Sequence, residues 1–276
     1  MSTYKQLLQT GRELLKQQGI ADADVDAWYL LAHVFKLKRT DLLLQGDYFA
    51  EEDGKNRYLE LLQKRADHIP LQHITGTQEF MGLEFMVNEH VLIPRQDTET
   101  LVEEVLNYCE DKTVLDMCTG SGCIILSLAK LRRLKRAVGV DLSQQALQVA
   151  TKNALAHNVR IEWIQSNLFD NVEGSFDILV SNPPYIPSSD IEELMPEVKE
   201  YEPRMALDGS KDGLEFYRCI SKEAKRHLNP DGLLFYEIGY NQGDAVKKIL
   251  TEEGFTDIMI KKDLGGHDRV VSARMT

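Results

Sequence analysis

The sequence contains few cysteines and histidines, and their spacing does not suit a metal site. The four cysteines lack the Cys-x-x-Cys spacing of zinc and redox sites, and the seven histidines form no ligand cluster. They are Cys109, Cys118, Cys123 and Cys219. We therefore expect free thiols in a reducing compartment, and no metal.

Long apolar runs and an excess of positive charge are also missing. No apolar run approaches the roughly 18 residues that a membrane-spanning helix needs. The polar N-terminal stretch does not fit a signal peptide, so we expect a cytoplasmic protein with no membrane partner. The formal net charge of −12 opposes strong binding to phosphates, and we expect no stable nucleic-acid partner.

The first part of the chain, residues 1–75, is predicted to be a small helical bundle. Apolar residues recur at helical spacing from Tyr4 to Leu15 and from Val25 to Phe35, the second run including Trp28, Tyr29 and Ala32. A third helix is expected to carry Tyr58, Leu61 and Leu62. Residues 76–93 follow, in which two short apolar segments flank Gly82 and predict a β-hairpin linker.

From residue 94 to residue 276, strands alternate with helices, which predicts an α/β domain with a parallel sheet. The connection between the last two strands is too short for a crossover helix, so they should pair antiparallel. The expected strands are Thr113–Met117, Ala137–Asp141, Arg160–Gln165, Phe176–Ser181, Gly232–Ile238, Thr256–Lys261 and Arg269–Arg274.

The motif Asn182-Pro183-Pro184-Tyr185 directly follows the buried strand predicted at 176–181. Two prolines stop the strand and leave carbonyl oxygens without neighbouring amide donors. A carboxamide precedes them and an aromatic ring follows. This combination suits holding a planar, weakly nucleophilic nitrogen, such as an amide or an exocyclic amine; a simple turn before proline is the alternative interpretation of Asn182.

A second motif follows the strand at 113–117, where Cys118-Thr119-Gly120-Ser121-Gly122 leads into an apolar helix. Glycines let a ligand approach the backbone closely. Asp141 ends the next strand, at the spacing of an acid that accepts from ribose hydroxyls. Asp116 at the first strand's end fits a pyrophosphate poorly and a cationic group better.

The segment Ser166-Asn167-Leu168-Phe169 follows the third predicted strand and should flank an adenine ring. Asn167 is expected to accept from the adenine amino group and Leu168 to pack on the ring. Ordinary core packing is an equally good interpretation of Leu168 and Phe169.

The order and spacing of these motifs resemble the class I methyltransferase fold, a Rossmann-like seven-stranded sheet with an antiparallel last strand. Within it, the chain resembles the release-factor glutamine N5-methyltransferases, the HemK/PrmC family, over nearly its whole length. The resemblance depends on the segments Pro70 to Gly76, Ile93-Pro94-Arg95-Gln96-Asp97-Thr98-Glu99, Leu115-Asp116 with the glycine loop, Asn182 to Ile186, and Gly232 to Gly239.

The resemblance implies methyl transfer from S-adenosyl-L-methionine, with S-adenosyl-L-homocysteine as product. The acceptor would be the amide nitrogen of the glutamine in the Gly-Gly-Gln loop of peptide-chain release factors, which modulates translation termination. The helical domain would dock the rest of the factor. It also implies that Cys118 to Gly122, Asp141 and Asn182 contact the cofactor, and that Asn182 to Tyr185 hold the substrate.

For the reaction, we expect the Asn182 side-chain oxygen and the Pro183 carbonyl to accept the two amide hydrogens, while Tyr185 packs on the amide plane. Two other substrates fit the same motif. They are a ribosomal-protein glutamine and a flipped nucleic-acid base, methylated at adenine N6 or guanine N2. A binding module without catalysis is the remaining alternative.

The sequence departs from the family pattern at Cys118, Gln96 and Leu168, where glycine, proline and a larger aromatic residue are usual. If Cys118 needs a positive φ, its side chain costs about 1 kcal/mol. Arg95, Asp97 and Glu99 either orient the pocket or pair with other groups at a helix start.

Overall fold

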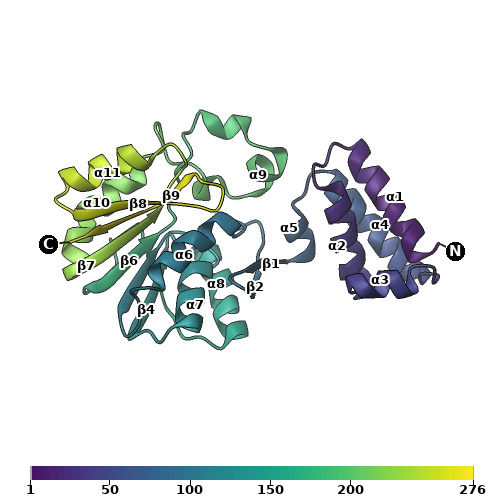
Figure 1. Ribbon diagram of the computed structural model, residues 1–276, viewed down its shortest axis with the longest axis horizontal. Coiled ribbons are helices and arrows are strands. Elements are labelled where there is room, and N and C mark those ends of the chain that lie inside the picture. Colours follow the sequence, from purple (N-terminus) through teal and green to yellow (C-terminus); the bar gives the residue numbers. More distant parts are fainter. Residues whose placement is uncertain (1, 276) are drawn as a thin grey trace. The chain divides into compact units, whose positions relative to one another are not determined.

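The computed structural model describes residues 2–275 and divides the chain into two compact units (Figure 1). The first unit contains the residues up to Gly76 together with Met195–Tyr201. The second contains Thr77–Leu194 and the residues from Glu202 onward. The short segment from Met195 was not expected in the helical unit, because its sequence separation from residues 1–75 hides the contact.

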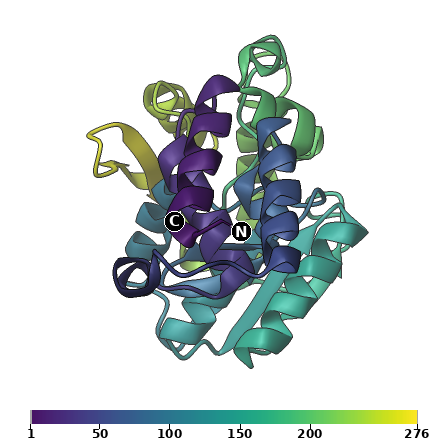
Figure 2. The same ribbon diagram turned by 90° about the vertical axis from the view of Figure 1, so that its right-hand side faces the viewer.

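The helical unit consists of α1 (Tyr4–Gln17), α2 (Ala23–Phe35), α3 (Arg39–Gln45), α4 (Glu52–Ala66), α5 (Leu71–Thr75) and α9 (Pro196–Tyr201). Thr3 caps α1: its hydroxyl accepts from the Gln6 amide at 3.3 Å, and the Gln6 side chain accepts from the Thr3 amide at 2.9 Å. This reciprocal pair satisfies amide groups that would lack partners at the helix start. Figure 2 shows α1 running beside its neighbours in this unit.

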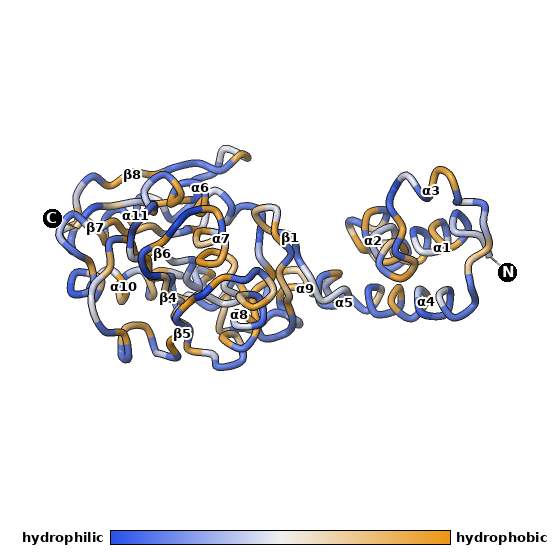
Figure 3. Tube along the Cα trace, turned by 90° about the horizontal axis from the view of Figure 1, so that it is seen from below, coloured by the Kyte–Doolittle hydropathy of each residue, from blue (hydrophilic) through white to orange (hydrophobic). Residues whose placement is uncertain are grey.

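The predicted helical stripes pack as a core, with one correction on α2. Tyr58, Leu61 and Leu62 of α4 are buried as expected. On α2, however, Val25 and Tyr29 are exposed, and the buried face is formed by Ala23, Ala27, Trp28, Leu30 and Leu31. The helix is apolar around most of its circumference, so periodicity alone did not identify the inner face. Figure 3 shows hydrophobic and hydrophilic residues alternating along the helices of this unit.

The second unit is built on a seven-stranded sheet with the order β5-β4-β3-β6-β7-β9-β8. Its strands are β3 (Thr113–Met117), β4 (Arg136–Asp141), β5 (Glu162–Gln165), β6 (Phe176–Ser181), β7 (Leu228–Glu237), β8 (Thr256–Lys262) and β9 (Asp268–Arg274). β9 lies between β7 and β8 and is antiparallel to both. The predicted sheet and its antiparallel last strand are therefore confirmed, with strand ends shifted by up to four residues.

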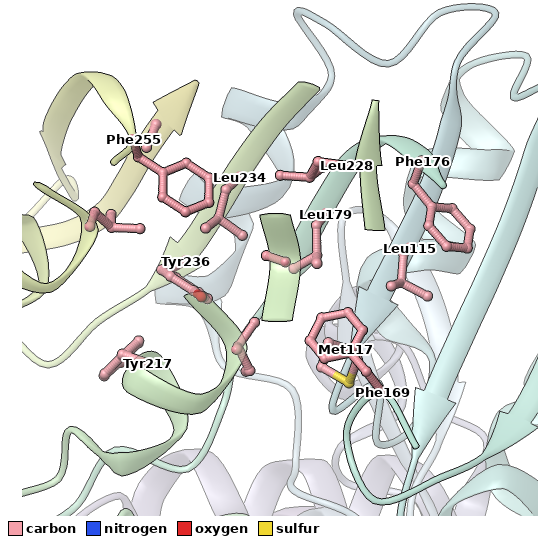
Figure 4. Close-up of a cluster of buried hydrophobic side chains, with 14 of the residues drawn as sticks. Leu115, Met117, Phe169, Phe176, Leu179, Tyr217, Leu228, Leu234, Tyr236 and Phe255 are labelled. Atoms are coloured by element: carbon pink, nitrogen blue, oxygen red, sulfur yellow. The ribbon is translucent and has the colours of Figure 1, made fainter. Parts of the chain in front are cut away.

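Helices cover both faces of the sheet. One face packs against α6 (Glu99–Val105), α7 (Cys123–Leu131) and α8 (Gln144–His157), and the other against α10 (Glu215–His227) and α11 (Gly243–Glu252). Short 3-10 helices η1 (Gln96–Thr98), η2 (Asp190–Glu193) and η3 (Arg204–Ala206) lie in the connections. The core against α10 and α11 includes Leu115, Leu179, Tyr217, Leu234 and Tyr236 (Figure 4).

The hairpin expected around Gly82 is present as β1 (Thr77–Phe80) and β2 (Leu83–Met86). Met81 and Gly82 both have positive φ, as a two-residue hairpin turn requires. Phe80 and Phe85 bury their rings in the core beneath α6 and α7. The hairpin is therefore packed against the core of the sheet unit.

Candidate active site

A cavity of about 330 Å³ lies where the chain leaves the carboxyl ends of β3, β4, β5 and β6. The strand order reverses between β3 and β6, and open parallel sheets bind ligands at such a point. Nine residues predicted from the sequence line the cavity: Cys118, Thr119, Gly120, Ser121, Asp141, Asn167, Leu168, Asn182 and Pro184. Four others do not: Asp116, Gly122, Pro183 and Tyr185.

The loop after β3 turns sharply enough to present its backbone to the cavity. Cys118, Gly120 and Gly122 all have positive φ, with values of 62°, 57° and 80°. A Cβ at Gly122 would lie 3.0 Å from the side chains of both Leu126 and Trp163, so these side chains would have to shift in addition to the strain of the positive φ. The sequence raised the possibility that Cys118 adopts a positive φ, and the structure shows this left-handed, strained conformation.

Asp116 lies under this loop and does not face the cavity. It is fully buried, and its Oδ2 accepts a hydrogen bond of 2.6 Å from the Thr119 hydroxyl. Its Oδ1 has no hydrogen-bond partner among the described residues. Burial raises the pKa of this carboxyl to about 7, against the lowering effect of Thr119. This placement gives Asp116 a role in holding the loop and does not support the direct cofactor contact predicted for it.

Asp141 joins the ends of two neighbouring strands at the cavity wall. Its Oδ2 accepts from the Gly120 amide at 2.8 Å, and its Oδ1 accepts from the Ser143 amide at 2.9 Å. Burial raises the pKa of Asp141, and these backbone donors counteract the rise. Each carboxylate oxygen retains a lone pair, so the group can still accept from two adjacent hydroxyls.

The segment after β5 reaches the cavity through Asn167 and Leu168. The Asn167 Nδ2 donates to the Asp170 side chain at 3.3 Å, which leaves the carboxamide oxygen as an acceptor toward a ligand. Leu168 lines the cavity with a positive φ of 48°. Phe169 is instead buried and stacks on His227 at 4.7 Å between ring centroids. Of the two interpretations considered, core packing holds for Phe169.

The Asn182 to Tyr185 motif leaves β6 with its side chains in two directions. Asn182 and Pro184 line the cavity, and the Asn182 Nδ2 donates to the Thr98 hydroxyl at 3.4 Å. The Tyr185 hydroxyl instead donates to Glu237 Oε1 at 3.4 Å, and Gln242 Nε2 donates to the Tyr185 carbonyl at 3.0 Å. Polar side chains of the sheet unit, Glu237 and Gln242, therefore hold the Tyr185 end of the motif.

The charged residues of the segment before α6 all have protein partners. Arg95 pairs with the buried Glu202, which also accepts from the Ile93 amide at 3.3 Å. Asp97 pairs with Arg269 at 3.1 Å. Glu99 accepts from the Met81 amide at 2.6 Å. The structural interpretation thus applies to Asp97 and Glu99, whereas Arg95 additionally lines the cavity.

Sequence reasoning gave no role to several residues of the cavity wall. Thr98 is the most notable because it contacts Asn182 directly. Its position inside the Ile93 to Glu99 segment could have indicated a role in the site. The charged residues of the same segment were the more obvious polar candidates. The others come from segments without a motif, among them His90, Leu142, Pro203, Met205 and Phe216.

Two kinds of feature are missing from residues 2–275. These residues contain no group of three or more histidine, cysteine or acidic side chains placed to hold a metal ion. Within the same range, no helix has both the length and the apolar character to cross a membrane.

Comparisons with known families and proteins agree with this geometry. The family model described as PrmC N-terminal domain matches residues 6–76, and the model described as methyltransferase small domain matches residues 96–197. A release factor glutamine methyltransferase of Geobacter sulfurreducens is 42% identical, and the alignment covers 99% of this chain and 97% of that protein. One from Clostridium botulinum is 41% identical, with 98% of each chain covered.

Solved structures with low sequence identity share the fold. A methyltransferase from Pyrococcus furiosus has a TM-score of 0.55 at 17% identity, covering 79% of this chain and 98% of that chain. The 16S rRNA N2 G1207 methyltransferase of T. thermophilus, in complex with AdoMet and guanosine, has a TM-score of 0.52 at 18% identity. That match covers 72% of this chain and 50% of the other. These likenesses confirm the class I methyltransferase fold.

Proposed function

The chain belongs to the release factor glutamine methyltransferase family, and from this premise we propose that it methylates the side-chain amide nitrogen of a glutamine in a peptide-chain release factor. The methyl donor is S-adenosylmethionine. The observation that carries the proposal is that the loop after β3 and the Asn182 motif after β6 line one cavity. A donor and an acceptor bound there would meet within one enclosed space.

The residues of the cavity fit the donor. Asp141 offers a carboxylate to ribose hydroxyls, and Asn167 offers a carboxamide oxygen to the adenine amino group. The positive φ values at Cys118 and Gly120 bring backbone close to a ligand. When bound, S-adenosylmethionine supplies a methyl group attached to a positively charged sulfonium. Once the methyl group is transferred, the sulfur of the product S-adenosylhomocysteine is neutral, which makes it a good leaving group.

The protein's part in the reaction is to position a poor nucleophile. A glutamine amide nitrogen shares its lone pair with the carbonyl. Acceptance of its two hydrogens by the Asn182 carboxamide oxygen and the Pro183 carbonyl would hold the nitrogen and aim its lone pair at the methyl carbon. With the donor bound, the new N–C bond would form as the S–C bond breaks, and the nitrogen would then lose one proton to water. Oriented dipoles in an enclosed site carry this kind of catalysis.

We assign the docking of the release factor to the helical unit. Four neighbouring apolar residues on and after α3 are strongly exposed, with 63–81% of their surface accessible: Leu43, Leu44, Tyr48 and Phe49. Exposed apolar groups gathered in one short segment are typical of a surface that binds another protein. A release factor is active at the ribosome, so the reaction would take place in the cytoplasm.

The assay that tests the proposed function compares substrates in parallel. The purified protein is incubated with labelled S-adenosylmethionine and a release factor, its Gln→Ala variant in the Gly-Gly-Gln loop, a ribosomal-protein preparation, or a DNA and RNA mixture. Label on the unmodified release factor alone supports the proposal. Label on ribosomal protein or nucleic acid instead would assign the site to one of the alternatives, which the names of the relatives do not favour.

A further inference from the structure

The Asn182 carboxamide has two ends with opposite hydrogen-bonding character. Its oxygen accepts and its nitrogen donates, and the two have nearly the same shape. A substrate amide that presents N–H groups needs the oxygen. Something in the protein must therefore hold the nitrogen end away from the substrate. If the carboxamide turned by 180°, its own N–H groups would face the N–H groups of the substrate, and no hydrogen bond could form.

Thr98 is the residue that contacts the nitrogen end. Asn182 Nδ2 donates to the Thr98 hydroxyl oxygen at 3.4 Å, and Thr98 is 3% exposed. A hydroxyl can accept from one group while it donates its single proton to another. The direction of the Asn182 contact therefore depends on where the Thr98 proton goes.

Glu237, at the end of β7, is a buried acid whose pKa the Thr98 hydroxyl lowers. It is 2% exposed, and the Tyr185 hydroxyl donates to its Oε1 at 3.4 Å. Burial raises the pKa of Glu237 to about 7, whereas the hydroxyl of Thr98 and the positive charge of Arg269 lower it. At pH values above this pKa, Glu237 is mostly ionised and can only accept hydrogen bonds, which favours the Thr98 proton turning toward it.

The surroundings leave few other donors for this carboxylate. Arg269 is already paired with Asp97 and Asp263, each at 3.1 Å. The Tyr217 hydroxyl donates to the Glu237 backbone carbonyl at 2.9 Å, so it is not directed at the side chain. Glu237 Oε2 has no hydrogen-bond partner among the described residues. Tyr185 thus donates to one oxygen of this buried acid, and the other oxygen is open to the Thr98 hydroxyl, which lowers the pKa of Glu237.

We propose that Thr98 and Glu237 are positioning residues that fix which end of the Asn182 carboxamide faces the substrate. Glu237 takes the Thr98 proton, the Thr98 oxygen takes a hydrogen of Asn182 Nδ2, and the Asn182 oxygen is left toward the cavity. This inference rests on the proposed function, because it presumes an acceptor nitrogen that donates hydrogens. It adds to that function a relay which the sequence motif alone does not contain.

The kinetic test compares two substitutions of Thr98 with a matched control. Thr98→Val keeps the shape and removes the hydroxyl, whereas Thr98→Ser keeps the hydroxyl. Thr98→Val should lower kcat by about 10- to 100-fold, the range for losing a group that orients a functional one. KM and donor affinity should remain within about 3-fold, because neither binding group is removed. Thr98→Ser should restore kcat, and Thr100→Val on α6 should not change it.

A second variant tests the carboxylate. Glu237→Gln keeps the size of the side chain but can donate to Thr98, which frees the Thr98 proton to turn toward Asn182. We expect kcat to fall by about 10-fold or more with donor affinity unchanged. Full kcat in either Thr98→Val or Glu237→Gln would overturn the proposal, and so would equal losses in Thr98→Val and Thr98→Ser.

A readout without substrate separates this inference from the proposed function. The side-chain amide signals of Asn182 can be identified in an NMR spectrum by their disappearance in Asn182→Ala. Their exchange with water should accelerate in Thr98→Val and stay at the wild-type rate in Thr98→Ser and Thr100→Val. If the wild-type protein does not methylate release factor, the proposed function fails, while unchanged exchange in Thr98→Val would contradict the relay itself.

Discussion

The carboxylate of Asp141 accepts the backbone hydrogen of Gly120 at 2.8 Å, which ties the end of β4 to the loop after β3. One acid therefore shapes the loop after β3 and, under the proposed function, would offer its remaining lone pairs to the methyl donor. This double use would connect the conformation of the loop with the affinity for the donor.

Asp141→Asn should weaken donor binding. The substitution replaces one accepting oxygen with an NH2 group, which donates. This group would face either the Gly120 amide or a ribose hydroxyl, and the hydrogen bond that the oxygen accepted would be lost. A cost of about 1.4 kcal/mol or more, a 10-fold rise in Kd, is expected for such a mismatch. Calorimetric titration with S-adenosylhomocysteine measures it, with Glu162→Gln on β5 as an exposed control. Equal affinities for Asp141→Asn and wild type would remove Asp141 from the cofactor site.

The left-handed backbone of Cys118 makes a prediction about stability. Cys118→Gly relieves the strain of φ 62° but also removes a side chain that packs against the core. Cys118→Ala removes most of the same side chain and keeps the strain. The glycine variant should therefore be more stable than the alanine variant by about 1 kcal/mol. Urea unfolding of both proteins checks this, and an alanine variant as stable as the glycine variant would contradict it.

Within the helical unit, Arg65 is a buried cation with two acidic partners. It donates to Asp26 at 2.7 Å and to Glu197 at 2.9 Å, and both Arg65 and Asp26 are less than 9% exposed. Burial raises the pKa of Asp26, which Arg65 counteracts. Arg65→Met should lower the free energy of unfolding by about 3–5 kcal/mol, because a buried charge loses its partner.

The exposed Arg57, paired with Glu60 at 2.8 Å, provides the control for that substitution. Arg57→Met should change stability little, as is usual for surface ion pairs. The double variant Arg65→Met, Asp26→Leu should recover part of the loss in denaturant unfolding. No recovery would mean that the single variant fails for reasons other than the unpaired acid.

The buried acids predict a specific pH dependence of stability. The folded-state pKa of Asp116 is raised from 3.8 to about 7, so the folded protein holds this proton more tightly than the unfolded chain. The contribution of Asp116 therefore favours folding at low pH and is lost as pH rises from about 4 to about 7. Asp116→Asn should reduce this downward slope, measured as the free energy of unfolding across that range, and leave the share that the raised pKa of Glu237 contributes.

Asp177 should give a pH dependence of stability with the opposite sign to that of Asp116. Although partly buried, it accepts from Thr113 and Asn229, and these hydrogen bonds hold its pKa below the usual value. Its contribution is present above the ordinary carboxyl pKa and is lost in acid. Asp177→Asn should thus lower stability at neutral pH and leave it unchanged in strong acid. Parallel pH profiles for the Asp116 and Asp177 variants would contradict the assigned shifts.

The exposed apolar residues on and after α3 predict a separation of docking from catalysis. Leu44→Ser combined with Phe49→Ser should raise KM for an intact release factor by about 10-fold or more, since exposed apolar anchors dominate protein recognition. A short peptide carrying the Gly-Gly-Gln loop should be methylated at the wild-type rate. Leu155→Ser, at an exposed leucine of α8, is the control. A rise in KM for the peptide as well would mean that the segment acts on the catalytic site.

Much of the sheet could be predicted from the sequence because its strands are short apolar runs separated by amphipathic helices. The turn after β3 was also predictable, since Gly120, Gly122 and Asp141 fall at characteristic points of such a sheet; its contact with a cofactor stays a prediction. Asp116 was harder, because strand alternation places it on the α7 face while Met117 faces the cavity. Spacing along the chain says which strand end a residue belongs to, but alternation decides where its side chain points.

Contacts between segments that are far apart in the sequence could not be predicted from it. Thr98 meets Asn182 across 84 positions, and Glu197 meets Arg65 across 132. Neither pair has a periodic or compositional signal, because each residue alone is ordinary in its own segment. Such contacts come from tertiary packing, which a single sequence does not display.

Mass spectrometry of a release factor incubated with donor and enzyme tests the central claim most directly. We expect one added methyl group on the glutamine of the Gly-Gly-Gln loop with the wild-type protein. With Asn182→Ala, the rate of that modification should fall by about 100-fold or more while donor binding persists. A methyl group on another atom, or an unchanged rate with Asn182→Ala, would contradict it.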